Sequence, residues 1–187
     1  MEAKIVYFAE PGAQNTDEVL RLVKERAGEV GIKTVVVASS SGETAARAVE
    51  VLKGLKIVVV THQTGLKEPN SQEFKEEYRK KVEEAGGLML TTTHLFGGLS
   101  FAMRRKFNMY FFPEIMANTL RLFGQGVKAA CEIAVMAADA GLVRTDEDII
   151  AIAGTSKGAD AALLLRPANS LNFFDLKIKE ILCKPRF

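Results

Sequence analysis

Hydroxyl side chains gather in the stretch "SSSGET", residues 39–44, which follows the apolar run "KTVVVA". The free backbone N–H groups and the dipole at the start of a helix favour a bound anion, and serine and threonine hydroxyls add further donors. N-capping by Ser41 is the structural alternative, but it accounts for only one of these side chains. The stretch therefore predicts a phosphate site, in which the Glu43 carboxylate is a competing charge; its residues are Ser39, Ser40, Ser41, Gly42, Glu43 and Thr44.

The two histidines of the chain, His62 and His94, each follow a threonine at the point where an apolar run gives way to glycine. A metal site would need a third ligand at a useful spacing, which the sequence does not offer. Acid–base catalysis is open, because an ordinary imidazole titrates near neutral pH. A hydrogen bond to a ligand or to a neighbouring loop is the simpler alternative.

A third candidate segment is "GTSKGAD", residues 154–160. Its small residues let the backbone approach a ligand closely, and its lysine is a mobile cation. An ordinary tight turn between two strands is the alternative. Neither the phosphate-binding pattern G-x-x-x-x-G-K-[ST] nor the dinucleotide fingerprint G-x-G-x-x-G is present. The candidate residues are Gly154, Thr155, Ser156, Lys157 and Gly158.

These polar segments all follow predicted strands in a chain that alternates strand and helix patterns. Apolar residues at spacings of three and four predict helices, and short continuous apolar runs predict strands that are covered on both faces. Repeated β-α units imply a mostly parallel sheet with helices on both faces, whose carboxyl edge carries the polar segments and both histidines. We expect strands at 4–8, 33–38, 56–60, 88–92 and 148–154, and helices at 15–31, 41–54, 70–86 and within 113–141.

Composition bounds the class of protein. The 187 residues carry a formal charge of +2, and 48% of them are apolar, which suits one folded domain over residues 1–187 and gives no general attraction to nucleic acid or membrane. No apolar run approaches the length of a membrane span, and the amino terminus lacks a secretory pattern. Cys131 and Cys183 could form one disulfide, but two separate buried thiols are the favoured interpretation. We therefore expect a cytoplasmic protein.

Two further segments have several interpretations. Residues 101–112, "FAMRRKFNMYFF", mix a basic triplet with aromatic residues. This mixture suits single-stranded nucleic acid, a lid or subunit interface, or buried packing, and we favour the last. The glycines of "FGQG", residues 123–126, predict a kink, or a close contact with the sheet, a ligand or another helix.

The stretch "VVVASSSGETAARAV" followed by "KIVVVTHQTG" resembles the carboxy-terminal domain of pyruvate kinase. Ser39, Ser41, Gly42, Thr44 and Ala45 stand where that family has its T-x-S-G-x-[S/T]-A turn, which holds a phosphate of a sugar-bisphosphate effector in members that have one. The segment 154–165 is similar to the effector loop, but lacks its aromatic and arginine contacts. Nothing corresponds to the catalytic barrel, so the resemblance implies no kinase activity.

Stretches such as "FAEPG" and "NTLRLFGQGVK" look more like stand-alone archaeal and bacterial proteins of this fold, which are associated with bound flavin mononucleotide (FMN). The resemblance implies a three-layer α/β/α fold with an antiparallel edge strand and the strand order 88–92, 57–61, 33–38, 149–153, then the antiparallel strand. It implies FMN at the sheet edge, with its phosphate on the serine-rich turn and its ring lined by Thr61, His62, Gly65, His94 and Gly97. The alternatives are a regulatory module that senses a phosphorylated metabolite, and an assembly protein; a homo-oligomer fits any of these.

Overall fold

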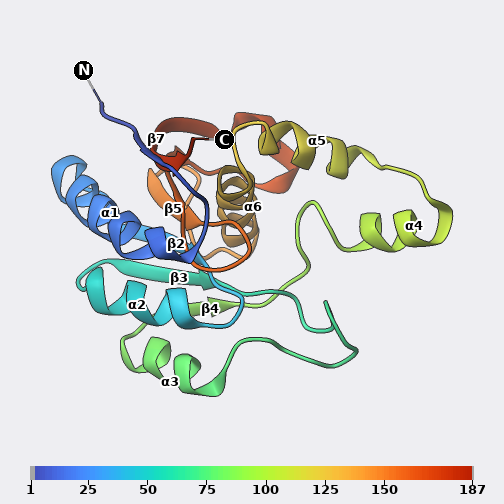
Figure 1. The fold of residues 1–187 in the computed structure, drawn as a ribbon, viewed down its shortest axis with the longest axis horizontal. Helices are drawn as coiled ribbons and strands as arrows, with labels where there is room; N and C mark the ends of the chain where they lie inside the picture. Colours follow the sequence, from blue (N-terminus) through green and yellow to red (C-terminus); the bar gives the residue numbers. More distant parts are fainter. Residues whose placement is uncertain (1–2, 187) are drawn as a thin grey trace.

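The computed structural model describes residues 3–186. Its centre is a seven-stranded sheet in the order β1-β7-β6-β5-β2-β3-β4 (Figure 1). The strands are β1 (Val6–Phe8), β2 (Thr34–Ala38), β3 (Lys56–Val60), β4 (Leu88–Leu90), β5 (Ile149–Ala153), β6 (Ala161–Arg166) and β7 (Lys177–Pro185).

The predicted strand order is confirmed from β4 to β6, with β2 between β3 and β5. The neighbouring pairs among β2, β3, β4 and β5 are parallel, and β6 runs antiparallel to β5 and β7. The expected edge position of the antiparallel strand is wrong, because β7 continues the sheet beyond β6. The amino-terminal strand β1, whose place the sequence leaves open, pairs in parallel with β7 and forms the edge.

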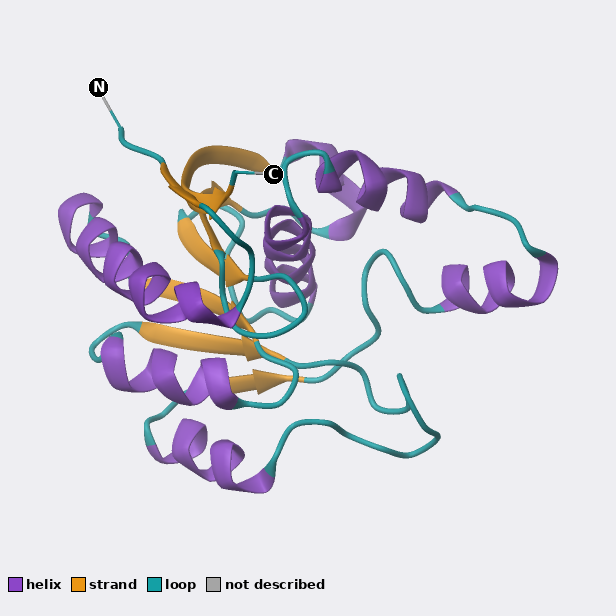
Figure 2. Ribbon diagram, in the orientation of Figure 1, coloured by secondary structure: helices purple, strands orange, loops and turns teal. Residues whose placement is uncertain are grey.

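Helices cover both faces of this sheet, as predicted. Figure 2 shows helices on both sides of the sheet. Alternate residues of β2 belong to two cores: Val35 and Val37 pack with α1, α2 and α3, whereas Val36 packs with α6. Helix α5 packs on α6. The helices are α1 (Thr16–Val30), α2 (Glu43–Val51), α3 (Glu76–Glu84), α4 (Leu99–Phe107), α5 (Phe112–Arg121) and α6 (Gln125–Asp139), with short 3-10 turns at Ala13–Asn15 and Ser170–Asp175.

Helix α3 begins later than the sequence pattern predicts. Residues 70–75 form an irregular loop, in which the Lys75 N–H donates to the carbonyl oxygen of Ser41. The predicted apolar stripe of Phe74, Tyr78 and Val82 is confirmed, because these side chains pack into the core that α1 and α2 share. Residues 70–75 therefore lack helical hydrogen bonds and instead contact the residues just before α2.

The predicted helical stretch 113–141 is two helices, separated at Gly124. This glycine has φ of 122° and is the N-cap of α6, three residues after α5 ends at Arg121. Gly126 lies against the sheet so closely that a Cβ atom there would be 2.6 Å from Cβ of Ala161. The glycine pair therefore both breaks the helix and lets α6 approach the sheet.

Helix α4 stands away from the sheet at the end of the long connection that follows β4 (Figure 1). It contains no buried residue, so the favoured interpretation of 101–112 as buried packing is wrong. Cys131 and Cys183 are both free and buried, as expected. None of the helices within residues 3–186 has the length and apolarity that a membrane crossing requires.

Candidate functional site

A pocket of about 750 Å³ lies at the carboxyl edge of the sheet. The segments that follow β1, β2, β3, β4 and β5 all contribute to it, as parallel strands require. One side is a stripe of α6 at helical spacing: Gln125, Lys128, Ala129, Glu132, Ile133 and Met136. Both histidines line this pocket, which confirms that they share one rim.

The serine-rich turn forms one end of the pocket. Its helix is capped by the backbone of Gly42, which has φ of 101°, and not by the Ser41 side chain, so that expectation is wrong. Glycine is required there, because a Cβ atom would lie 2.6 Å from Cβ of Tyr78. Ser39 Oγ accepts a hydrogen bond from the N–H of Ala45 at 3.3 Å. Ser39 therefore stabilises the first turn of α2, and Ser41 is left for other contacts.

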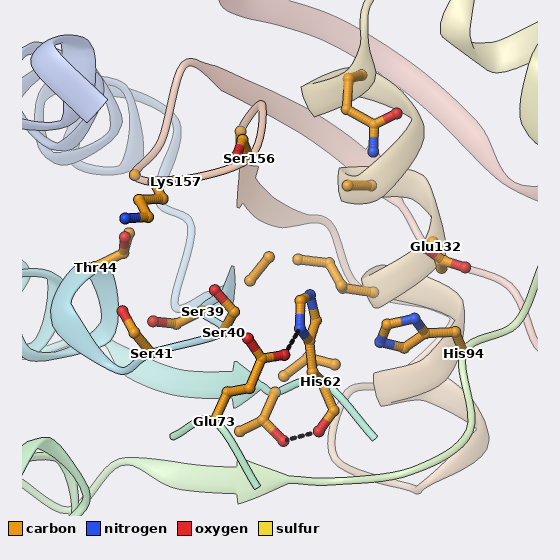
Figure 3. Close-up of a pocket in the computed structure, with 18 of the residues that line it drawn as sticks. Ser39, Ser40, Ser41, Thr44, His62, Glu73, His94, Glu132, Ser156 and Lys157 are labelled. Atoms are coloured by element: carbon orange, nitrogen blue, oxygen red, sulfur yellow. Dashed lines mark hydrogen bonds and ion pairs between the residues drawn. The ribbon is translucent and has the colours of Figure 1, made fainter. Parts of the chain in front are cut away.

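Three other hydroxyls of this turn face the pocket (Figure 3). Within residues 3–186 the side chains of Ser40, Ser41 and Thr44 have no hydrogen-bond partner, although Thr44 is buried. Hydroxyl groups in such a position ordinarily bond to water or to a ligand. The turn therefore presents several free donors at the amino-terminal end of α2.

The segment after β5 faces the serine-rich turn across the pocket. Lys157 extends toward Thr44 (Figure 3), and its ammonium forms no ion pair with the residues that the structure describes. The buried carboxylate of Asp160 holds this segment, since Oδ2 accepts from the N–H groups of Thr155 at 3.0 Å and Gly12 at 2.9 Å. At Gly158 a Cβ atom would lie 2.3 Å from Cα of Ala13. The glycine thus serves packing between two loops, and the lysine is the group that is free to bind.

An ionic network holds His62 at the opposite side of the pocket. Its Nδ1 lies 2.7 Å from Oε2 of Glu73, whose second oxygen pairs with Lys67. The hydrogen bonds from His62 and Lys67 hold the pKa of Glu73 below its ordinary value. Glu73 therefore remains ionised and fixes the imidazole ring, which leaves Nε2 of His62 available to a ligand.

The ring of His94 meets that of His62 edge to face, with 5.4 Å between the ring centroids. Burial lowers the pKa of His94, and the nearby Glu132 carboxylate opposes this effect only in part. Glu132 is buried and ion-paired with the equally buried Lys128, and its Oε1 accepts from the N–H of Phe96 at 3.0 Å. The pocket therefore places a neutral imidazole beside one that is bound to a carboxylate.

The structure brings most of the predicted site residues together. Three of them do not line the pocket: Gly42 packs on α3, Gly65 donates its N–H to the carbonyl oxygen of Ser71, and the N–H of Thr155 bonds to Asp160. Those that do line it are Ser39, Ser40, Ser41, Glu43, Thr44, Thr61, His62, His94, Gly97, Gly154, Ser156, Lys157 and Gly158.

Sequence reasoning missed six charged residues that line the pocket: Arg47, Lys67, Glu73, Arg121, Lys128 and Glu132. A signal for two of them exists: Lys128 and Glu132 are charged residues four apart in an otherwise apolar helix, which is the spacing of a helical ion pair. No sequence pattern indicates that Glu73 lies in the pocket, because only the conformation of the loop before α3 brings it to His62. Within residues 3–186, no group of three or more histidine, cysteine, aspartate or glutamate residues is arranged to hold a metal ion.

Comparison with known families identifies the fold. Residues 17–164 match the family model described as "Pyruvate kinase, alpha/beta domain". The chain belongs to this family. The matched range contains β2 to β5 and the first four residues of β6, together with the serine-rich turn, both histidines and Lys157. The strand β7, which the family match does not reach, extends the sheet beyond β6.

Solved structures with a similar fold include whole pyruvate kinases. One from Cryptosporidium parvum is 14% identical, with a TM-score of 0.45, over 82% of this chain and 23% of that one. The same enzyme in complex with ADP is 16% identical, with a TM-score of 0.40, over 80% and 22%. The NAD+ synthetase of Burkholderia pseudomallei is 14% identical, with a TM-score of 0.34, over 73% and 51%. The chain spans less than a quarter of those pyruvate kinases, and the likeness concerns the fold alone.

Proposed function

We propose that this member of the pyruvate kinase alpha/beta domain family binds a small phosphate-bearing ligand in its pocket, and that the ligand is FMN. The observation that carries the proposal is the group of unpartnered hydroxyls on Ser40, Ser41 and Thr44 opposite the free ammonium of Lys157. A phosphate has the charge and the acceptor oxygens that such a set of donors needs.

The charges around the serine-rich turn are compatible with an anion. Glu43 is the acidic residue in the first turn of α2, and its Oε1 accepts a hydrogen bond from Arg47 at 2.9 Å. Arg47 also pairs with Asp17. Glu43 lines the pocket, but its carboxylate is paired with Arg47, which also lines the pocket and offsets the negative charge beside the hydroxyl donors. The positive end of the α2 dipole adds to the attraction.

The rest of the pocket suits a flat ring with polar edges. Ala129, Ile133 and Met136 of α6 offer apolar contact, and Phe101 of α4 lies at the rim. His62 and His94 supply hydrogen-bonding groups, and the carboxylates of Glu73 and Glu132 are neutralised by their own partners. The volume of about 750 Å³ lies in the usual range of roughly 300–1,000 Å³ for pockets that enclose such ligands.

FMN would supply redox chemistry in this site. The residues of the chain would bind the phosphate at the serine-rich turn, and Nε2 of His62 could exchange a hydrogen bond or a proton with the ring or with a substrate beside it. His94, neutral because it is buried, would act as a hydrogen-bonding group and not as a charge.

A second candidate is a sensor that binds a phosphorylated metabolite without converting it. The polar lining of the pocket favours this candidate. Its hydroxyls, two imidazoles and lysine can form hydrogen bonds with the hydroxyl groups of a sugar phosphate as readily as with the polar edge of a flavin ring. This candidate uses the same phosphate end and differs in what occupies the rest of the pocket.

Titration with FMN and with riboflavin, which lacks the phosphate, tests the proposal. Flavin fluorescence should report tighter binding of FMN than of riboflavin by about tenfold or more, since charged hydrogen bonds contribute roughly 1.5–3 kcal/mol each. The double variant Ser41→Ala, Thr44→Ala and the single variant Lys157→Met should lose this preference, whereas Thr145→Ala, an exposed hydroxyl outside the pocket, should keep it.

Two outcomes would contradict the FMN proposal. Equal affinity of the unaltered protein for FMN and riboflavin would show that the serine-rich turn and Lys157 do not bind the phosphate of FMN. Absence of flavin binding, together with a rise in thermal stability with sugar phosphates that the Ser41→Ala, Thr44→Ala variant abolishes, would establish the sensor in its place.

A further inference from the structure

The arm, which we define as residues 99–115, leaves an apolar surface exposed. In α4, Leu99, Met103 and Phe107 recur every fourth residue and therefore lie along one face of the helix. Leu99 is 83% exposed and Phe107 is 54% exposed. Met103, between them, is 40% exposed, so the described residues cover the stripe only in part.

The other side of α4 faces the ligand pocket. Phe101 lines that pocket, and Arg104 lies over the rings of Phe101 and Tyr110 at 5.3 and 5.4 Å. Arg104 also pairs with the buried carboxylate of Glu114 at 2.9 Å, which joins α4 to α5. The helix is thus tied to the molecule by its polar side, and its apolar side is turned outward.

The exposed surface continues beyond α4. Phe112 is 63% exposed, and Met109 and Ile115, before and after it, are 57% and 54% exposed. Tyr110 is 64% exposed, although one part of its ring contacts Arg104. With an aromatic side chain burying about 150–250 Å², the arm offers on the order of 800 Å² of apolar surface, which matches the share of one partner in an interface of standard size.

The arm needs its partner for its own stability. Helices shorter than about 12 residues are marginal in water unless they bury an apolar face, and α4 is nine residues long with none buried. If α4 needs a partner in order to fold, that partner must always be available to the protein. A second copy of the same chain is always available. We propose that two copies associate through their arms, with the α4 stripes packed against each other about a two-fold axis.

Charge favours an antiparallel pairing. The basic residues of α4, Arg104, Arg105 and Lys106, lie in its last turn. In an antiparallel pair centred on Met103, the middles of these turns lie on opposite sides of the centre, about 6 Å apart along the axis. Met103 then meets the partner's Met103, and Phe107 packs on the partner's Leu99. A parallel pairing would bring the basic turns together.

The association has a consequence for the pocket. Phe101 lies on the same nine-residue helix, two positions from Leu99 and from Met103. Packing of the stripe on a second copy fixes α4, and with it the wall that Phe101 contributes. Each pocket is therefore complete only in the dimer, although its phosphate end, on α2, does not depend on the arm.

Sedimentation equilibrium at micromolar concentration tests the dimer without any ligand. The unaltered protein should have twice the mass of one chain. The variant Met103→Glu, Phe107→Glu should be a folded monomer whose circular-dichroism spectrum loses at most the helical signal of α4. Leu171→Glu, which alters a leucine that is 96% exposed in the 3-10 turn Ser170–Asp175, should remain a dimer. The proposal would be overturned if the unaltered protein were a monomer, or if the variant Met103→Glu, Phe107→Glu remained a dimer.

A single cysteine tests the symmetry. Only a two-fold interface brings a residue next to its own copy. Met103→Cys should form a covalent dimer under mild oxidation, and the native cysteines are both buried, so the background should be low. Cross-linking at Leu171→Cys in preference to Met103→Cys would place the interface elsewhere. Neither experiment on the dimer depends on flavin binding. Failure of the dimer proposal would therefore leave the FMN proposal untouched, and failure of the FMN proposal would leave the dimer proposal untouched.

Discussion

Nδ1 of His62 lies 2.7 Å from Oε2 of Glu73, and the two residues come from different ends of the loop between β3 and α3. The backbone carbonyl of His62 also accepts a hydrogen bond from the Gln72 side chain at 3.0 Å. Two contacts therefore hold residues 72–73 next to His62, just after the end of β3. The side chains of the loop itself bring its two ends together.

The variant Glu73→Gln should be less stable at pH 7 by roughly 1 kcal/mol, because a half-buried charged hydrogen bond is lost. The pKa of Glu73 is lowered in the folded protein, so its contribution is present above its ordinary pKa and is lost as the pH falls through the folded value. Urea unfolding should thus show a difference at pH 7 that shrinks in acid. Glu68→Gln, an exposed residue of the same loop, is the control; an equal loss in both variants would contradict the argument.

Stability should fall as the pH drops below about 6.5, in part because of His94. The pKa of His94 is lowered by burial, so in this range the unfolded chain takes up a proton that the folded protein does not. The fall should stop below the folded pKa of His94. His94→Gln should flatten this segment of the curve of unfolding free energy against pH, measured by urea titration. A slope that is the same in both proteins would assign the effect to other groups.

The buried pair of Lys128 and Glu132 should behave non-additively. Glu132→Gln keeps an acceptor for the N–H of Phe96 but leaves the Lys128 charge unpaired, which should cost roughly 3–5 kcal/mol. Adding Lys128→Met should recover most of this loss, because no charge then remains buried. Chemical denaturation of the two single variants and the double variant forms the cycle. A double variant no more stable than Glu132→Gln would refute the account.

Two glycines of helices should respond to alanine in opposite directions. Gly126→Ala should destabilise by about 1–3 kcal/mol, because its Cβ atom would lie 2.6 Å from Cβ of Ala161 and 2.7 Å from Oδ1 of Asp160. Gly28→Ala, in α1, meets nothing within 4 Å and should stabilise by roughly 0.5–1 kcal/mol through higher helix propensity. Thermal unfolding of both variants provides the comparison, and a shift of the same sign in both would contradict it.

The sheet and its polar edge were predictable because each rests on a local pattern. Strands β2, β3 and β5 are continuous apolar runs, since helices cover both of their faces, and the loop after each parallel strand must lie at the carboxyl edge. The positions of β1 and β7 were not predictable in this way. Their pairing joins residues from opposite ends of the chain, and β1 is only three residues long.

The incorrect predictions have similar causes. The predicted helix 70–86 begins only at Glu76, because hydrogen bonds to Ser41 and His62 hold the residues before it in a loop. The aromatic content of 101–112 is typical of a core, whereas the apolar stripe of α4 becomes visible only when Leu99 is included. At the candidate site, hydroxyls and histidines at strand ends were identifiable. Glu73 was not, because a loop conformation alone brings it to the pocket.

The pairing of β1 with β7 sets an order of events during synthesis. Val6 aligns with Cys183, and the N–H of Arg186 donates to the carbonyl oxygen of Phe8 at 3.0 Å. Strand β1 is synthesised long before β7, so Val6 and Phe8 have no neighbouring strand until β7 has been made. Removal of residues 177–186 would leave β1 without its neighbour in the sheet, so this truncation should make the segment that contains β1 sensitive to proteases.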